Sequence, residues 1–277
     1  MHLRPDHAVR DLRTLHAFIR AHPLGVLTTS LPSKNFPTLQ CSHIPWVLDS
    51  EPPTGTSTTE NNASFLGIMR GHIARANPQS KAIVEAVTES RTQPSADQSP
   101  SDNKGGDILP EEVMIVFTSP VDHYITPNFY TEGKVGGKVA PTWNYAAVQV
   151  YGRAHIYHDS KDEGTGEFLH QQLTDLARLG EEGVMGFREG GNSTKSEGEH
   201  TPWKIADAPQ QYIATLKKNI VGMRIEITRI EGRFKVSQER PVNDRTGVVE
   251  GLEGIQGRAR EMAEFVKSGR VLTGTAE

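Results

Sequence analysis

The chain has 277 residues, of which 35% are hydrophobic and 23% charged, a length sufficient for one large domain or two small ones around a real core. The formal net charge is −4, and the isoelectric point is about 6.3. Nucleic-acid binders usually carry a clear basic excess, so this balance argues against a nucleic-acid partner.

The ends of the chain and its single cysteine bear on location. The N-terminal segment MHLRPDHAVRDL is charged and lacks the apolar centre of a signal peptide. No stretch approaches the ~20 apolar residues that a membrane span needs. Cys41 is the only cysteine, so no intrachain disulfide can form, and we expect it to pack as a small hydrophobic residue. These features predict a cytoplasmic protein without membrane contact.

The first third of the chain predicts one helix, three strands and a second helix. Apolar residues at helical spacing indicate a helix over 11–21, which His22-Pro23 would end. Strands are predicted over 25–30, over 37–49 with a break at Pro45, and over 64–72. Asn77 suits the N-cap and Pro78 the first position of a helix that we expect over 78–88.

The remaining elements continue this order. We predict strands over 112–120 and 144–158 with a loop rich in glycine and proline over 122–145 between them, and helices over 167–179 and 209–218, the second with a possible cap at Asp207. Apolar and polar residues alternate over 221–237, which indicates a strand with one buried face. Helices are predicted over 243–251 and 258–267.

The order of these elements favours one fold class. The strands come in runs and do not alternate strictly with helices, so we predict an α+β fold built on a mainly antiparallel barrel. Residues 1–268 would form a single domain with polar insertions at 50–63, 89–110 and 189–201, and residues 269–277 a flexible tail.

Common catalytic motifs are missing, which leaves three unusual stretches. The sequence contains no phosphate-binding P-loop, dinucleotide-binding glycine motif, nucleophile elbow or zinc-protease helix. In the first stretch, GHIARANPQS, His72 stands between a strand and a capped helix. Rigid elements on both sides would hold a ligand side chain in place. His72 is therefore a solvated loop residue, a packed structural histidine or a ligand.

The second stretch is APTWNYAAVQVYG. Trp143 and Tyr145 share one face of the predicted strand, with Asn144 on the other. The aromatic residues are either a pair in the core or a wall for a flat cofactor.

The third stretch, GRFKVSQER, ends a predicted strand. Lys235, Ser237 and Gln238 would offer an anion partner and hydrogen-bond donors, unless this is only an exposed strand end. By contrast, His155 and His158 lie three apart near a strand end and would face opposite ways, so we do not expect them to share a metal ion.

Several blocks in order carry a family resemblance. HPLGVLTTS, SHIPWVLD, GHIARANPQ, YITPNFY, PTWNYAAVQVYGRA, IVGMRIEITRIEGRFKVSQ and DRTGVVEGLE follow one another along about residues 1–268. Together they resemble the PaiB-type family of FMN-binding negative transcriptional regulators. The resemblance implies a split β-barrel of the FMN-binding type with peripheral helices. It also implies a homodimer with ligand sites at the subunit interface.

One branch of that family resembles the haem-dependent piperazate synthases. These enzymes close an N–N bond in the amino acid N5-hydroxy-L-ornithine to give piperazic acid. The resemblance implies haem b with His72 as its axial ligand and Lys235 near it, and Lys235 and Tyr130 are candidate proton acceptors. The other predicted cofactor contacts are His43, Arg75, Trp143, Asn144, Tyr145, Ser237 and Gln238.

The alternative is an FMN- or haem-binding regulator or sensor without turnover. The C-terminal block DRTGVVEGLEG resembles the regulators more than the synthases. For FMN, residues 28–30 with Arg70 or Lys235 would contact the phosphate, which needs several donors. We therefore predict a haem b protein with piperazate synthase-like activity, with FMN as the alternative cofactor and a regulator or sensor as the alternative function.

Overall fold

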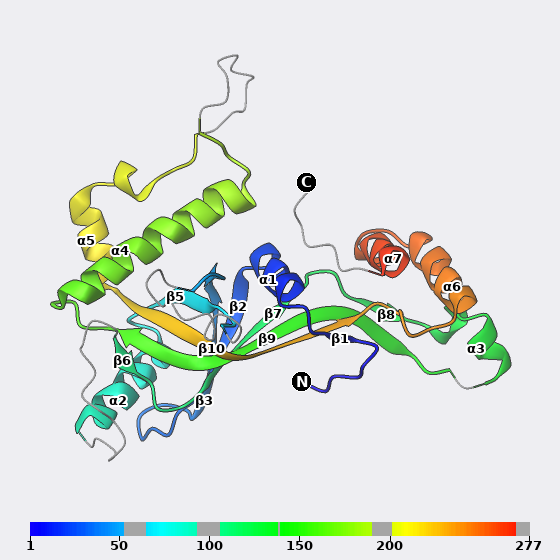
Figure 1. Ribbon diagram of the computed structural model, residues 1–277, viewed down its shortest axis with the longest axis horizontal. Helices are drawn as coiled ribbons and strands as arrows, with labels where there is room; N and C mark the ends of the chain where they lie inside the picture. The colour runs from blue at the N-terminus through cyan, green and yellow to red at the C-terminus, as the bar shows by residue number, and fades with distance from the viewer. Residues whose placement is uncertain (53–64, 93–105, 138, 190–200, 270–277) are drawn as a thin grey trace. The chain divides into compact units, whose positions relative to one another are not determined.

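The computed structural model describes residues 1–52, 65–92, 106–137, 139–189 and 201–269 (Figure 1). Most of each predicted insertion and nearly all of the predicted tail lie outside these residues. The chain divides into two compact units. Unit 1 comprises residues 1–23, 115–150 and 229–277, and unit 2 comprises residues 24–114 and 151–228. Strands β7 (Val113–Thr118), β9 (Thr142–Tyr157) and β10 (Ile220–Lys235) contribute residues to both units.

Unit 1 contains short strands on the edges of the long ones. Strand β1 (Ala8–Val9) pairs with β10, and β8 (His123–Ile125) pairs with β9, both antiparallel. Its helices are α1 (Leu12–Ala21), η2 (Pro127–Phe129), α3 (Glu132–Val135), α6 (Val242–Glu253) and α7 (Arg258–Ser268). Helices α6 and α7 lie side by side (Figure 1).

Helix α1 packs against β10 and contributes to the hydrophobic core of unit 1. The Asp11 carboxylate accepts a hydrogen bond of 2.8 Å from the Thr14 amide and so caps the helix. The Phe18 ring of α1 packs 5.0 Å, between centroids, from the Phe234 ring of β10. A Cβ atom at Gly232 would lie 2.2 Å from Leu15 Cδ2, so a larger residue there would displace the Leu15 side chain between α1 and β10.

Unit 2 is built from antiparallel strand pairs and three longer helices. Strand β2 (Leu24–Ser30) pairs with β3 (Leu39–Pro45), while β5 (Ile68–Ala74) lies between β4 (Val47–Asp49) and β10. Strand β6 (Asp107–Ile108) pairs with β9. Its helices are α2 (Pro78–Thr92), α4 (Glu163–Arg178), η3 (Leu179–Val184), η4 (Ile205–Asp207) and α5 (Gln210–Lys218).

These pairings confirm the predicted α+β class with a mainly antiparallel sheet. Several local predictions differ from the structure. The predicted cap at Asp207 is wrong, because Pro209 precedes α5 without a side-chain cap and the Asp207 carboxylate accepts a hydrogen bond from the Lys204 amide. Helix α4 begins at Glu163, before the predicted start at residue 167. Helix α2 continues to Thr92 instead of ending near residue 88, because the next helix-breaking residue is Pro94. The loop predicted over 122–145 contains β8, η2 and α3, which are too short to show a periodic pattern.

The prediction for Cys41 is wrong. Its side chain is exposed, as is that of His43 two residues further along β3. Because alternate residues of a strand share a face, both belong to the open face of β3, while Ile44 on the other face is buried.

Candidate functional site

The end of β10 and the start of β9 form a cationic cluster in unit 1. The Lys235 ammonium donates a hydrogen bond of 2.9 Å to the Trp143 carbonyl and another to the Thr142 hydroxyl. Burial lowers the pKa of Lys235; Glu239 opposes this shift, and the charge of Arg233 adds to it. Lys235 is therefore a partly buried ammonium group that lacks a carboxylate contact among the described residues.

An aromatic pair lies beside Lys235. Trp143 is 54% exposed, and Tyr124, its partner across the β8–β9 ladder, is 42% exposed. Their ring centroids are 6.3 Å apart with the planes at 69°. Trp143 is thus not a core residue, so the prediction of a buried pair of aromatic residues does not hold for it. Tyr145 is half-buried, with the Arg233 guanidinium 5.7 Å from its ring centroid.

Asn144 and Ser237 connect the two strands beneath this surface. Both are buried, and Asn144 Nδ2 donates a hydrogen bond of 2.9 Å to Ser237 Oγ. Asn144 Oδ1 has no hydrogen-bond partner among the described residues. Ser237 has a φ of 61°, and no other non-glycine residue of the described chain has a positive φ. Strained backbone of this kind is concentrated at functional sites.

Gln238 is occupied by hydrogen bonds within the protein, whereas the buried Tyr130 hydroxyl has no hydrogen-bond partner among the described residues. The Gln238 amide accepts a hydrogen bond of 2.7 Å from the Val236 amide and donates one of 2.8 Å to the Asp6 carbonyl. Tyr130 is buried, and the Arg240 guanidinium lies 4.6 Å from its ring centroid. Burial raises the pKa of Tyr130, so its hydroxyl stays protonated at neutral pH and is a weak proton acceptor.

Helix α6 fixes the segment that carries Tyr130. Asp244 is buried, and its Oδ1 atom accepts hydrogen bonds from the amides of residues 131–133 at 2.9, 2.9 and 3.2 Å. A Cβ at Gly247 would lie 2.1 Å from the Phe129 carbonyl oxygen, and one at Gly251 2.3 Å from the Phe129 ring. The part of α6 with the sequence DRTGVVEGLE therefore packs against η2 and binds the backbone at the start of α3. Sequence reasoning missed this role, although Asp244, Gly247 and Gly251 share one helical face.

His72 lies in unit 2, on β5 opposite Gly222 of β10. Its ring is half-buried, and its Nδ1 atom is buried without a hydrogen-bond partner among the described residues. Burial lowers the pKa of His72, which favours the neutral imidazole. A Cβ at Gly222 would lie 2.6 Å from the Phe168 ring of α4, so this helix covers the face that His72 shares. The solvated-loop interpretation is therefore excluded.

The other predicted residues of unit 2 have different surroundings. His43 is exposed on β3. The Arg75 guanidinium donates to the carbonyls of His158 and Lys218 at 2.7 and 3.0 Å, so it joins the ends of three elements. Arg70 binds the carboxylates of Asp49 and Asp175 at 2.6 and 2.8 Å. These ion pairs occupy Arg70, which was one of the predicted phosphate contacts.

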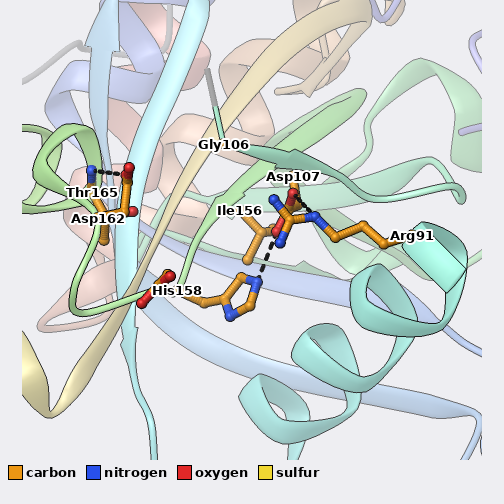
Figure 2. Close-up of a pocket in the computed structure, with 8 residues that line it drawn as sticks. Arg91, Gly106, Asp107, Ile156, His158, Asp162 and Thr165 are labelled. Atoms are coloured by element: carbon orange, nitrogen blue, oxygen red, sulfur yellow. Dashed lines mark hydrogen bonds and ion pairs between the residues drawn. The ribbon is translucent and has the colours of Figure 1, made fainter. Parts of the chain in front are cut away.

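A second cluster surrounds a small cavity of about 130 Å³ in unit 2 (Figure 2). Asp107 lies between Arg91 at 2.7 Å and His158 at 2.8 Å. His155 instead lies 3.7 Å from Glu226. Within the described ranges, no group of three His, Cys, Asp or Glu side chains could hold a metal ion. The Asp107 contacts join the end of α2 to β6 and β9.

Unit 1 therefore brings together Lys235, Trp143, Asn144, Tyr145 and Ser237, whereas His43, His72 and Arg75 belong to unit 2. No helix in the part of the chain that the structure describes is long and apolar enough to cross a membrane.

Comparison with known proteins identifies the family. Residues 1–229 match the family described as "Putative FMN-binding domain". An uncharacterised protein of Aspergillus fumigatus is 46% identical over 256 residues, which cover 92% of each chain. The Bacillus subtilis "Protease synthase and sporulation protein PAI 2" is 30% identical over 158 residues, 57% of this chain and 63% of that protein. The chain belongs to the family described as "Putative FMN-binding domain".

Two solved structures have only a distant similarity to the chain. The flavocytochrome Anf3 from Azotobacter vinelandii has a TM-score of 0.43 at 11% identity, covering 84% of this chain and 72% of that one. An FAD- and haem-binding protein from Mycobacterium smegmatis has a TM-score of 0.42 at 8% identity, covering 83% and 73%.

Proposed function

We propose that the chain binds FMN and that the Lys235 cluster of unit 1 is the contact site for it. Membership in an FMN-binding family supports the choice of cofactor. The observation that carries the proposal is a partly buried ammonium group next to an exposed aromatic pair, Trp143 and Tyr124. A bound flavin would supply reversible redox chemistry.

The residues of this cluster fit a planar, anionic group. The Lys235 ammonium forms hydrogen bonds with Thr142 and Trp143 and no direct ion pair with a described carboxylate, although the charge of Glu239 acts on it. The buried Nε atom of Arg233 has no hydrogen-bond partner among the described residues. Both groups can pair with phosphate oxygens, which form strong charge-assisted hydrogen bonds. The Trp143 ring offers an open face on which an aromatic ring system can stack.

Titration with FMN, followed by quenching of flavin fluorescence, tests this proposal. Lys235→Met removes the charge, and we expect about tenfold weaker FMN binding. Lys134→Met is the matched control, because Lys134 is an exposed lysine of the same unit. Riboflavin, which lacks the phosphate, should bind wild type and Lys235→Met alike. Equal FMN affinity of the two lysine variants would contradict the site, and no saturable FMN binding would contradict the function.

A second candidate is a haem b protein with His72 as the axial ligand. The observation that favours it is the buried Nδ1 atom of a neutral imidazole without a partner among the described residues, since neutral imidazole is the form that binds iron. Bound haem iron would supply the Lewis acidity for a piperazate synthase-like ring closure of N5-hydroxy-L-ornithine. In this candidate, His72 holds the cofactor.

The absorption spectrum of the purified protein separates the two candidates. Flavin gives paired bands in the near ultraviolet and blue, whereas haem gives a Soret band. For haem, His72→Ala should abolish the Soret band of the reconstituted protein, and His2→Ala, which changes an exposed histidine outside the predicted cofactor contacts, should keep it. Formation of a dehydrated cyclic product from N5-hydroxy-L-ornithine would then distinguish an enzyme from a sensor. We further propose a homodimer, which sedimentation velocity can test.

A further inference from the structure

A groove of about 380 Å³ lies in unit 2 between α4, η4 and α5. Its volume is within the range of roughly 300–1,000 Å³ that is typical of small-molecule sites. Most of its wall is apolar, and none of its lining residues is acidic. The apolar lining residues are Ile205, Ala206, Ala208, Ile213 and Ala214.

Lys217 is the charged residue of this wall. It is half-buried in the last turn of α5, and its Nζ atom donates a long hydrogen bond of 3.4 Å to the Gly166 carbonyl. It makes no ion pair with any described residue. A partly buried ammonium group is stabilised by a carboxylate partner, and none of the described residues provides one here. The Lys217 ammonium therefore stands next to the apolar lining of the groove and can pair with an anion bound there.

We propose that this groove binds a small carboxylate with an apolar chain, of the fatty-acid type. The chain would cover the alanine and isoleucine side chains, and the carboxylate would pair with Lys217 Nζ. His170 and Gln210 complete the polar part of the lining and can donate further hydrogen bonds. The ligand should be an anion, because the groove is lined by a lysine and by no acidic side chain. This inference does not depend on flavin or haem binding.

Isothermal titration calorimetry of the full chain with octanoate tests the inference. We expect saturable binding of one octanoate per chain, weaker binding of 1-octanol and no binding of octylamine, which has the same chain with the opposite charge. Lys217→Met should weaken octanoate binding about tenfold or more. Lys218→Met is the matched control, because Lys218 is exposed and does not line the groove. Octylamine binding as tight as octanoate, or equal effects of the two lysine variants, would overturn the inference.

A variant that fills the groove supplies an independent test. Ala214 is exposed on α5, so Ala214→Trp should keep the far-UV circular dichroism spectrum and melting temperature while it abolishes octanoate binding. If that variant does not fold, Ala206→Leu on η4 replaces it. Unchanged octanoate affinity in a folded filling variant would overturn the site. Dissociation of an oligomer by the variant, seen in sedimentation velocity, would assign the groove to a second copy of the chain and also overturn the proposal.

Discussion

The Asn144 amide donates a hydrogen bond of 2.9 Å to the Ser237 hydroxyl, and both side chains are buried. This bond joins the start of β9 to the turn that follows β10. The FMN proposal depends on two residues close to this bond in sequence. Trp143 directly precedes Asn144, and Lys235 lies two residues before Ser237. Its loss would therefore affect both stability and ligand binding.

Substitutions of Ser237 separate the hydrogen bond from the backbone strain. Ser237→Ala leaves the Asn144 amide buried without this partner, and we expect a loss of about 1–3 kcal/mol in the free energy of unfolding. Ser237→Gly loses the same bond but relieves the positive φ of 61°, so it should be about 1 kcal/mol more stable than the alanine variant. Urea unfolding measures both values. Equal stability of the two variants would show that the backbone at Ser237 is not strained.

Asp244→Ala should destabilise the protein by about 2 kcal/mol, because three backbone amides lose their charged acceptor. Glu250→Gln on the same helix removes an exposed carboxylate and serves as the control. Urea unfolding gives the comparison. An effect of Asp244→Ala no larger than that of Glu250→Gln would mean that the amides find other acceptors.

The two glycines of α6 that face Phe129 should not tolerate a methyl group. Alanine at Gly247 or Gly251 would bring Cβ to 2.1 or 2.3 Å from Phe129, and we expect about 1–3 kcal/mol of destabilisation from overpacking. Gly254→Ala is the control, since the nearest atom to a Cβ there is 3.5 Å away. Thermal melting of the three variants should rank Gly254→Ala as the most stable, and any other order would contradict the close approach of η2 to α6.

The lowered pKa of His72 predicts a pH dependence of stability. In the unfolded chain its pKa is near 6.5, whereas burial lowers it in the folded state. Between the folded value and 6.5 the unfolded state therefore binds more protons, so stability falls as pH is lowered through this window. His72→Gln should reduce the slope of unfolding free energy against pH. His22, whose pKa burial also lowers, should contribute a slope that remains in this variant.

The sequence was sufficient to predict the long helices and strands. It was weakest for burial and for short elements, which depend on contacts with residues far away in the chain. Alternation over Val221 to Ile227 predicted the buried face of β10 correctly. Alternation along the strand also placed Trp143 and Tyr145 on one face of β9. It could not show which face of β9 other elements cover and bury. Helix α3 was missed because the amides of its first turn are held by Asp244, more than a hundred residues away in sequence.

Strand β10 passes Gly222, opposite His72, near its beginning and ends at Lys235. Along a strand, the insertion or deletion of one residue turns every later side chain to the other face. A one-residue length change within residues 229–235 of β10 would thus turn Lys235 to the other face of the strand, even if every residue type were kept. We expect natural variants of this protein to accept substitutions in β10 far more readily than insertions, whereas changes in length should be confined to the segments between the elements.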